Sequence, residues 1–76
     1  MDKKQLKYVN GVARLDYGLS SIEELALKLG YKDSEKMATA EGFGNIYDYF
    51  TQKGFVKRYL DVRRRLNLIG IKPVFG

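Results

Sequence analysis

Residues 54–70 read GFVKRYLDVRRRLNLIG, and the spacing of their apolar side chains predicts one amphipathic helix bounded by Gly54 and Gly70. At 100° per residue, large apolar residues that recur every three or four positions share one face of a helix. Here that face consists of Phe55, Tyr59, Val62, Leu66 and Ile69. We therefore expect this face to pack on the core and the opposite face to meet solvent.

Positive charge surrounds the apolar face of this predicted helix. Lys57 and Arg64 lie opposite the apolar face, and Arg58, Arg65 and Arg63 lie on its two flanks. Asp61 is the only acidic residue of this predicted helix. Residues 53–76 carry seven Lys or Arg against one Asp, whereas residues 1–52 carry seven against eight Asp or Glu. Such an asymmetry is typical of surfaces that bind nucleic acid, an acidic protein or anionic lipid headgroups. A merely solvated helix is the alternative.

The length of 76 residues predicts one small domain, 1–76, with a marginal core. The chain has no Cys and no His, so neither disulfides nor a zinc site of the usual Cys/His type can stabilise it. Six of the ten aromatic residues lie between residues 43 and 59, and we expect the core to be centred there.

The same composition bears on function and location. Without His or Cys, acid–base catalysis would fall to carboxylates or tyrosines, so we expect no enzyme, no metal site and no cofactor. No stretch of 18 apolar residues occurs, and the N-terminus lacks the apolar run of a secretory signal. We therefore expect no membrane span and a cytoplasmic location.

Three shorter helices are predicted before the basic one. Ser21 and Glu24 form the pattern of a capping box, and Gly30 supplies the stop of a helix over residues 21–29. Asp33 or Ser34 can cap a second helix that runs to about Glu41, and Asn45 can cap a third over residues 46–53. We see no internal repeat and no linker, and we expect a mostly α, compact bundle of four to five short helices.

The two ends of the chain are less determined. Residues 2–17 can form a helix with Leu6, Val9, Ala13 and Tyr17 on one face, or a β-hairpin that turns at Asn10–Gly11. A lone hairpin is marginal and would need a third strand, for which residues 71–75 are the candidate, so the helix is favoured. Pro73 predicts that the C-terminal tail is extended.

Residues 13–38, ARLDYGLSSIEELALKLGYKDSEKMA, resemble the helix-turn-helix superfamily of DNA-binding domains. The likeness lies in Leu25–Ala26 within the first motif helix and in Leu29-Gly30-Tyr31 at the turn. The family places a buried apolar residue about six positions after the turn glycine, where this chain has Lys36, so Met37 fits only with a longer turn. The recognition helix that this resemblance implies contains two acids, Glu35 and Glu41, whose negative charge repels DNA phosphates.

A second helix-turn-helix arrangement avoids this difficulty. Residues 46–53 would form its first helix, Gly54 its turn and residues 55–68 a basic recognition helix, although one glycine is short for a turn that usually takes three or four residues. The run RRRLNLIGIKP is similar to the end of many such recognition helices. The arginines can then reach phosphates or guanine edges.

These observations predict a small DNA-binding protein of the size used by phage or mobile-element regulators of transcription, acting as a homodimer on two half-sites. The predicted nucleic-acid-binding residues are Lys53, Lys57, Arg58, Arg63, Arg64, Arg65, Asn67 and Lys72. The first alternative is a protein-interaction module, an inhibitor or adaptor, whose basic helix docks on an acidic partner. RNA binding is the third candidate, with Tyr47, Tyr49 and Tyr59 either stacking on bases or, as we favour, packing in the core.

Overall fold

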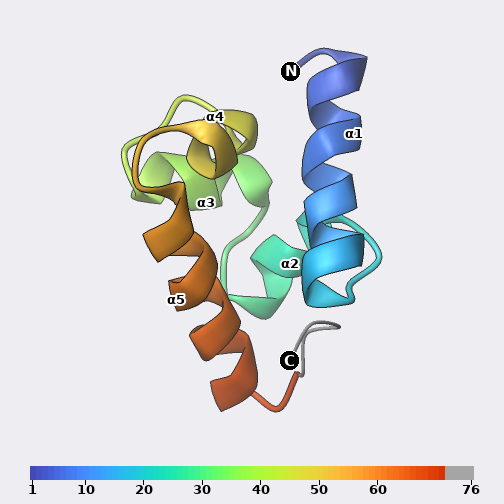
Figure 1. The fold of residues 1–76 in the computed structure, drawn as a ribbon, viewed down its shortest axis with the longest axis vertical. Helices are drawn as coiled ribbons and strands as arrows, with labels where there is room; N and C mark the ends of the chain where they lie inside the picture. The colour runs from blue at the N-terminus through green and yellow to red at the C-terminus, as the bar shows by residue number, and fades with distance from the viewer. Residues whose placement is uncertain (72–76) are drawn as a thin grey trace.

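Five α-helices and one π-helical turn make up residues 1–71, the part of the chain that the computed structural model describes (Figure 1). The predicted mostly α bundle is confirmed, and no strand occurs within these residues. The predicted extended tail and Lys72 lie outside them. In order, the elements are α1 (Lys3–Gly11), the π-helical turn η1 (Val12–Asp16), α2 (Ile22–Lys28), α3 (Ser34–Ala40), α4 (Ile46–Thr51) and α5 (Phe55–Leu68).

The N-terminal segment is helical, so the alternative β-hairpin is wrong. Val9, Ala13 and Tyr17 are fully buried on one face, as the helical spacing predicts, whereas Leu6 remains 45% exposed. Asn10, the residue that favoured a hairpin turn, instead accepts a hydrogen bond from the backbone N–H of Ile22 at 2.9 Å through its side-chain oxygen. In the helix, Asn10 therefore bonds to a partner twelve residues away, at the start of α2, which a hairpin turn at Asn10–Gly11 does not require.

The predicted N-caps of the next three helices are confirmed. The side chains of Ser21, Asp33 and Asn45 each accept a hydrogen bond from the backbone N–H three residues further on. The capping box is confirmed only in part, because the Glu24 carboxylate accepts from the backbone and hydroxyl of Ser20 rather than from the Ser21 N–H. Helix α4 ends at Thr51, two residues earlier than predicted.

The structure also corrects the expectation that the chain has no internal repeat. The three N-caps are twelve residues apart, and the glycines that follow each helix with positive φ, Gly30, Gly42 and Gly54, have the same spacing. An aromatic residue follows each glycine. Burial follows the same period, at Ile22, Ser34 and Ile46 and again at the pairs Leu25–Ala26, Met37–Ala38 and Tyr49–Phe50.

The first two repeats end in the same hydrogen-bonded stop. The N–H of Tyr31 donates to the carbonyl of Ala26 at 2.9 Å, and Phe43 donates to Ala38 at the same distance, which is the six-to-one bond of a Schellman motif. The third repeat ends differently, because Gln52 is extended and Gly54 leads directly into α5. The third repeat therefore lacks this stop, because the basic helix α5 begins there.

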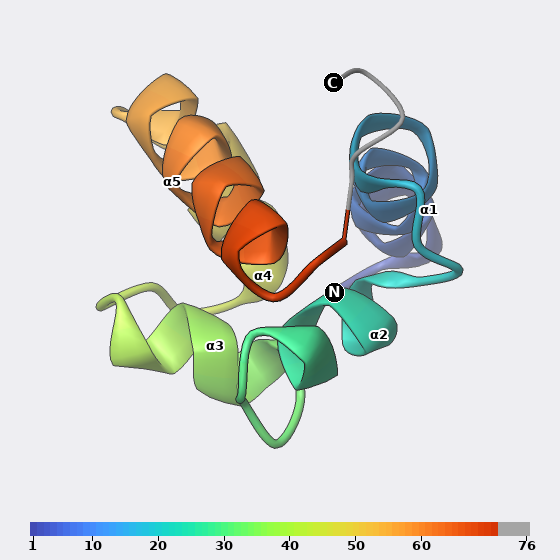
Figure 2. The ribbon, with the colours of Figure 1, turned by 90° about the horizontal axis from the view of Figure 1, so that it is seen from below.

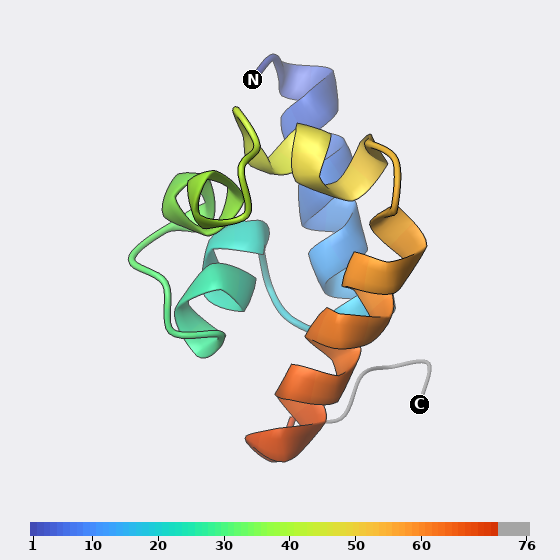
Figure 3. The ribbon, with the colours of Figure 1, turned by 90° about the vertical axis from the view of Figure 1, so that its left-hand side faces the viewer.

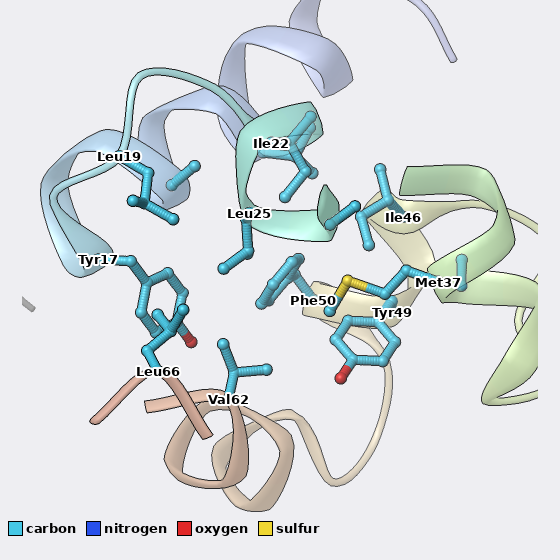
Figure 4. Close-up of a cluster of buried hydrophobic side chains, with 14 residues drawn as sticks. Tyr17, Leu19, Ile22, Leu25, Met37, Ile46, Tyr49, Phe50, Val62 and Leu66 are labelled. Atoms are coloured by element: carbon cyan, nitrogen blue, oxygen red, sulfur yellow. The ribbon is translucent and has the colours of Figure 1, made fainter. Parts of the chain in front are cut away.

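The core lies where the five helices converge. Figures 1 and 2 show α1 and α5 on opposite sides of the molecule, Figure 2 shows α2 and α3 together along a third side, and Figure 3 shows α4 crossing above the start of α5. Figure 4 shows Phe50 of α4 among side chains of α2, α3 and α5. The ring of Phe50 lies 4.9 Å from that of Tyr49 and 6.5 Å from that of Tyr17. The core therefore draws on the predicted aromatic segment, but extends from Val9 to Leu66.

Candidate nucleic-acid interface

Helix α5 contributes little of its surface to the core. Of its 14 residues only Val62 and Leu66 are fully buried, and Tyr59 is half-buried. Phe55 and Ile69, which the sequence placed on the inner face, are 40% and 53% exposed. The expected apolar face is therefore too long, because only the middle of α5 crosses the core. Lys57 and Arg64 are exposed on the far side, as predicted.

The side chain of Arg58 is held by the protein itself. Its guanidinium donates to three backbone carbonyls at the C-terminal end of α4 and just beyond it: Nε to Tyr49 at 2.6 Å, and the two Nη atoms to Lys53 at 3.0 Å and Gln52 at 2.9 Å. It also lies 4.5 Å from the ring centroid of Phe43, within the range of a cation–π contact. The last carbonyls of a helix lack intrahelical donors, and of these three only that of Gln52 also accepts from a backbone N–H within residues 1–71, that of Phe55 at 3.2 Å, so Arg58 acts as a C-terminal cap.

Arg65 has a similar role at the end of α2. Its Nη2 donates to the carbonyl of Leu29 at 3.2 Å, and its guanidinium lies 5.6 Å from the ring centroid of Tyr31. Burial by itself would lower the pKa of Arg65, but the side chain of Tyr31 and the carboxylate of Asp61 raise it above its ordinary value. Arg58 and Arg65 therefore join α5 to the ends of α4 and α2, which the sequence did not indicate.

The other predicted contact residues lie nearer to solvent. Arg64 forms an exposed ion pair with Asp61 at 2.7 Å, and its side chain is 74% exposed. Arg63 is half-buried on the flank towards Tyr17, where its charge slightly opposes the rise in the pKa of Tyr17 that burial causes. Lys53 and Asn67 are exposed at either end of the helix. Of the predicted set, Lys53, Lys57, Arg64 and Asn67 are therefore the most open side chains in the described residues.

An open groove of about 760 Å³ runs beside the outer face of α5. Its lining includes Lys57, Leu60, Asp61 and Arg64 of α5 together with Glu41 and Phe43, which follow α3. Arg58 and Tyr49 also line it, and Arg58 is already bonded to backbone carbonyls. The groove thus brings two available cations beside a segment that lies 14 or more residues earlier in the sequence.

The tyrosines considered for base stacking are used in packing. Tyr49 is 2% exposed and meets Phe43 and Phe50 edge-on at 5.6 and 4.9 Å. Burial raises the pKa of its hydroxyl to about 12. Tyr59 is half-buried with its ring 5.2 Å from that of Tyr17, whose hydroxyl donates to the Tyr59 carbonyl at 3.2 Å. Core packing is therefore the better interpretation of Tyr49 and Tyr59.

The connections between helices bear on both helix-turn-helix arrangements. Five residues separate α2 from α3, and with this longer turn Met37 is buried and Lys36 exposed. Three residues, Gln52 to Gly54, separate α4 from α5, because α4 ends earlier than predicted. A three-residue turn is the length that this motif usually takes.

Comparisons with protein-family models, curated proteins and solved structures find no match to this chain. Among residues 1–71, no helix is both long and apolar enough to cross a membrane. The same residues contain no group of three acidic side chains placed to hold a metal ion.

Proposed function

We propose that this protein binds double-stranded DNA by placing the outer face of α5 in the major groove. The observation that carries the proposal is the exposure of α5, which buries only Val62 and Leu66 and turns Lys57 and Arg64 to solvent. The major groove is about 12 Å wide and admits an α-helix that is free on most of its circumference. Residues 55–68, at about 1.5 Å each, give a helix of roughly 20 Å, which is long enough to follow the groove for several base pairs.

The predicted DNA-contacting side chains differ in how free they are to reach DNA. Lys53, Lys57 and Arg64 reach phosphates or bases, and Asn67 reaches base edges, because these side chains are exposed. The ion pair between Arg64 and Asp61 is exposed, and such pairs contribute about 0–1 kcal/mol, so a phosphate can replace Asp61 at little cost. Arg58 and Arg65 hold α5 in place rather than read DNA. The three-residue turn supports α4 and α5 as the two helices of the DNA-binding unit.

The proposal extends to a homodimer that regulates transcription. One helix of this length reads few base pairs, and two half-sites multiply the affinity of a small domain. The size and the resemblance to the helix-turn-helix superfamily fit regulators of the phage or mobile-element type.

The test compares two double variants with the same change in charge. The first is Lys57→Ala with Arg64→Ala on α5, and the control is Lys3→Ala with Lys4→Ala at the exposed start of α1. Binding to a random duplex is measured at several salt concentrations. We expect the α5 variant to lose affinity and to flatten the slope of log K against log salt by about 2, since each phosphate contact contributes about 0.9. Equal losses in the two variants, or salt-independent binding by the unmodified protein, would refute the proposal.

One observation favours the alternative of an acidic protein partner. The exposed surface of α5 includes Val56, Leu60 and Leu68, which are 60%, 55% and 79% exposed beside the cations. Apolar residues flanked by positive charge suit a protein interface better than a phosphate backbone. Leu60→Ser separates the two functions, because it should leave DNA affinity within a factor of two yet weaken a protein complex at least tenfold.

A further inference from the structure

A second groove lies away from the outer face of α5, between α1 with η1 and the first turn of α5. Its volume of about 250 Å³ is below the roughly 300–1,000 Å³ of sites for whole small molecules, and suits a single long side chain. The groove is lined by Tyr8, Val12, Asp16, Phe50, Phe55, Val56 and Tyr59. Four of these residues are aromatic and one is a carboxylate.

The aromatic walls are supported from behind. The ring of Tyr8 meets that of Tyr47 edge-on at 5.5 Å, and the ring of Tyr59 lies 5.2 Å from the buried Tyr17. The Tyr17 hydroxyl also donates to the Tyr59 backbone carbonyl at 3.2 Å, which ties the residue after η1 to α5. The walls are therefore positioned before any ligand arrives, which lowers the entropic cost of binding.

The twelve-residue repeat shows what these aromatic positions hold elsewhere in the molecule. Tyr31 of the first repeat lies under the guanidinium of Arg65, and Phe43 of the second lies under that of Arg58. The third equivalent residue, Phe55, lines the groove and is 40% exposed, and no cation from residues 1–71 lies over its ring. The third aromatic position thus lacks the arginine that the other two have.

Asp16 supplies the charge that such a cation needs. It is half-buried at the edge of the groove, and within the described part of the chain no Lys or Arg forms an ion pair with it. A carboxylate beside aromatic faces favours a planar guanidinium, which can stack on a ring and donate two parallel hydrogen bonds to the carboxylate. The same carboxylate repels phosphate, so this groove is not part of a nucleic-acid surface.

We propose that this groove binds an arginine side chain presented by a partner protein, in the position over Phe55 that Arg58 and Arg65 occupy over the earlier aromatics. The partner contributes the guanidinium, Asp16 receives it, and Tyr8, Phe55 and Tyr59 enclose its carbon chain. The site does not depend on DNA binding by α5, since it lies on a different side of that helix and shares no lining residue with the outer groove.

The experiment titrates the labelled protein with the capped peptide acetyl-Gly-Arg-Gly-amide and follows backbone amide shifts by NMR. The matched probe carries citrulline, which has nearly the shape of arginine but no charge. We expect saturable shifts confined to the amides around Tyr8, Asp16 and Phe55, with citrulline binding at least tenfold more weakly. Equal binding of the two peptides, no shifts, or shifts spread over the whole protein would overturn the proposal.

Two variants with controls complete the test. Asp16→Asn should weaken arginine binding at least fivefold, whereas Glu35→Gln, the same change in charge at an exposed position on α3, should not. Phe55→Leu should also weaken it because the ring face is lost while an apolar side chain remains, and the dispersion of the spectrum shows that each variant is folded. Unchanged binding by both groove variants would overturn the proposal. Shifts at the same residues on raising protein concentration without peptide would also do so, because a second copy would then be the occupant.

Discussion

Replacing Arg58 by alanine tests whether this residue is structural or contacts DNA. The sequence predicts that it contacts DNA, whereas in the structure it caps α4. The change removes three hydrogen bonds to the carbonyls of Tyr49, Gln52 and Lys53, at 2.6–3.0 Å, and a cation–π contact with Phe43. Arg58 is half-buried, so water can replace part of what is lost. The relevant scale is then about 0.5 kcal/mol or slightly more per hydrogen bond and about 0.5–1 kcal/mol for the ring contact.

These contributions sum to a loss of about 2–3 kcal/mol in the free energy of unfolding. A domain of this size has only about 4–11 kcal/mol in total, at roughly 0.05–0.15 kcal/mol per residue. The melting temperature should therefore fall by about 10–20 °C. Thermal and urea denaturation followed by circular dichroism measure the loss.

The control is Lys57→Ala, one residue earlier on the exposed face, which should change stability by less than about 0.5 kcal/mol. Arg58→Lys keeps the charge but not the planar fork, and should recover less than half of the loss. If Arg58→Ala is as stable as Lys57→Ala and its DNA affinity falls, the capping role is refuted and Arg58 is a DNA contact.

Three further predictions concern stability. Leu66→Ala, at a fully buried site on α5, should lower the free energy of unfolding by about 2–5 kcal/mol, measured by denaturation. Leu68→Ala, at a side chain that is 79% exposed, should change it very little. Similar losses in the two variants would mean that α5 does not pack on the core as described. Ser21→Ala should cost about 1 kcal/mol through loss of the N-cap of α2, and an unchanged melting temperature would place the start of the helix elsewhere. Burial raises the pKa of Tyr49 from 10.0 to about 12, so above pH 10 the folded state keeps a proton that the unfolded chain loses. The free energy of unfolding should therefore be constant below pH 10 and fall as the pH rises towards 12. Tyr49→Phe should reduce that fall, which melting at several pH values measures.

Features that depend on near neighbours along the chain are predictable from the amino-acid sequence. The N-caps at Ser21, Asp33 and Asn45 and the glycine stops at Gly30 and Gly70 act within about six residues, so their side chains and spacing suffice to predict them. The amphipathic spacing of residues 55–68 likewise located α5 and its exposed cations. The twelve-residue repeat is also present in the sequence, but it is harder to see because a polar residue, Ser34, stands at the buried position that Ile22 and Ile46 occupy in the other two repeats.

Features that depend on partners far away in the chain became visible only in the packing of the helices. Residues 2–17 carry signals for both a helix and a hairpin, and the bond from the Ile22 N–H to Asn10 accompanies the helix. The cations of α5 look alike in sequence, yet Arg58 and Arg65 donate to backbone carbonyls at the ends of α4 and α2, while Lys57 and Arg64 do not. Which arginine meets a carbonyl depends on how α4 and α2 lie beside α5, and helical spacing within one element contains no information about that arrangement.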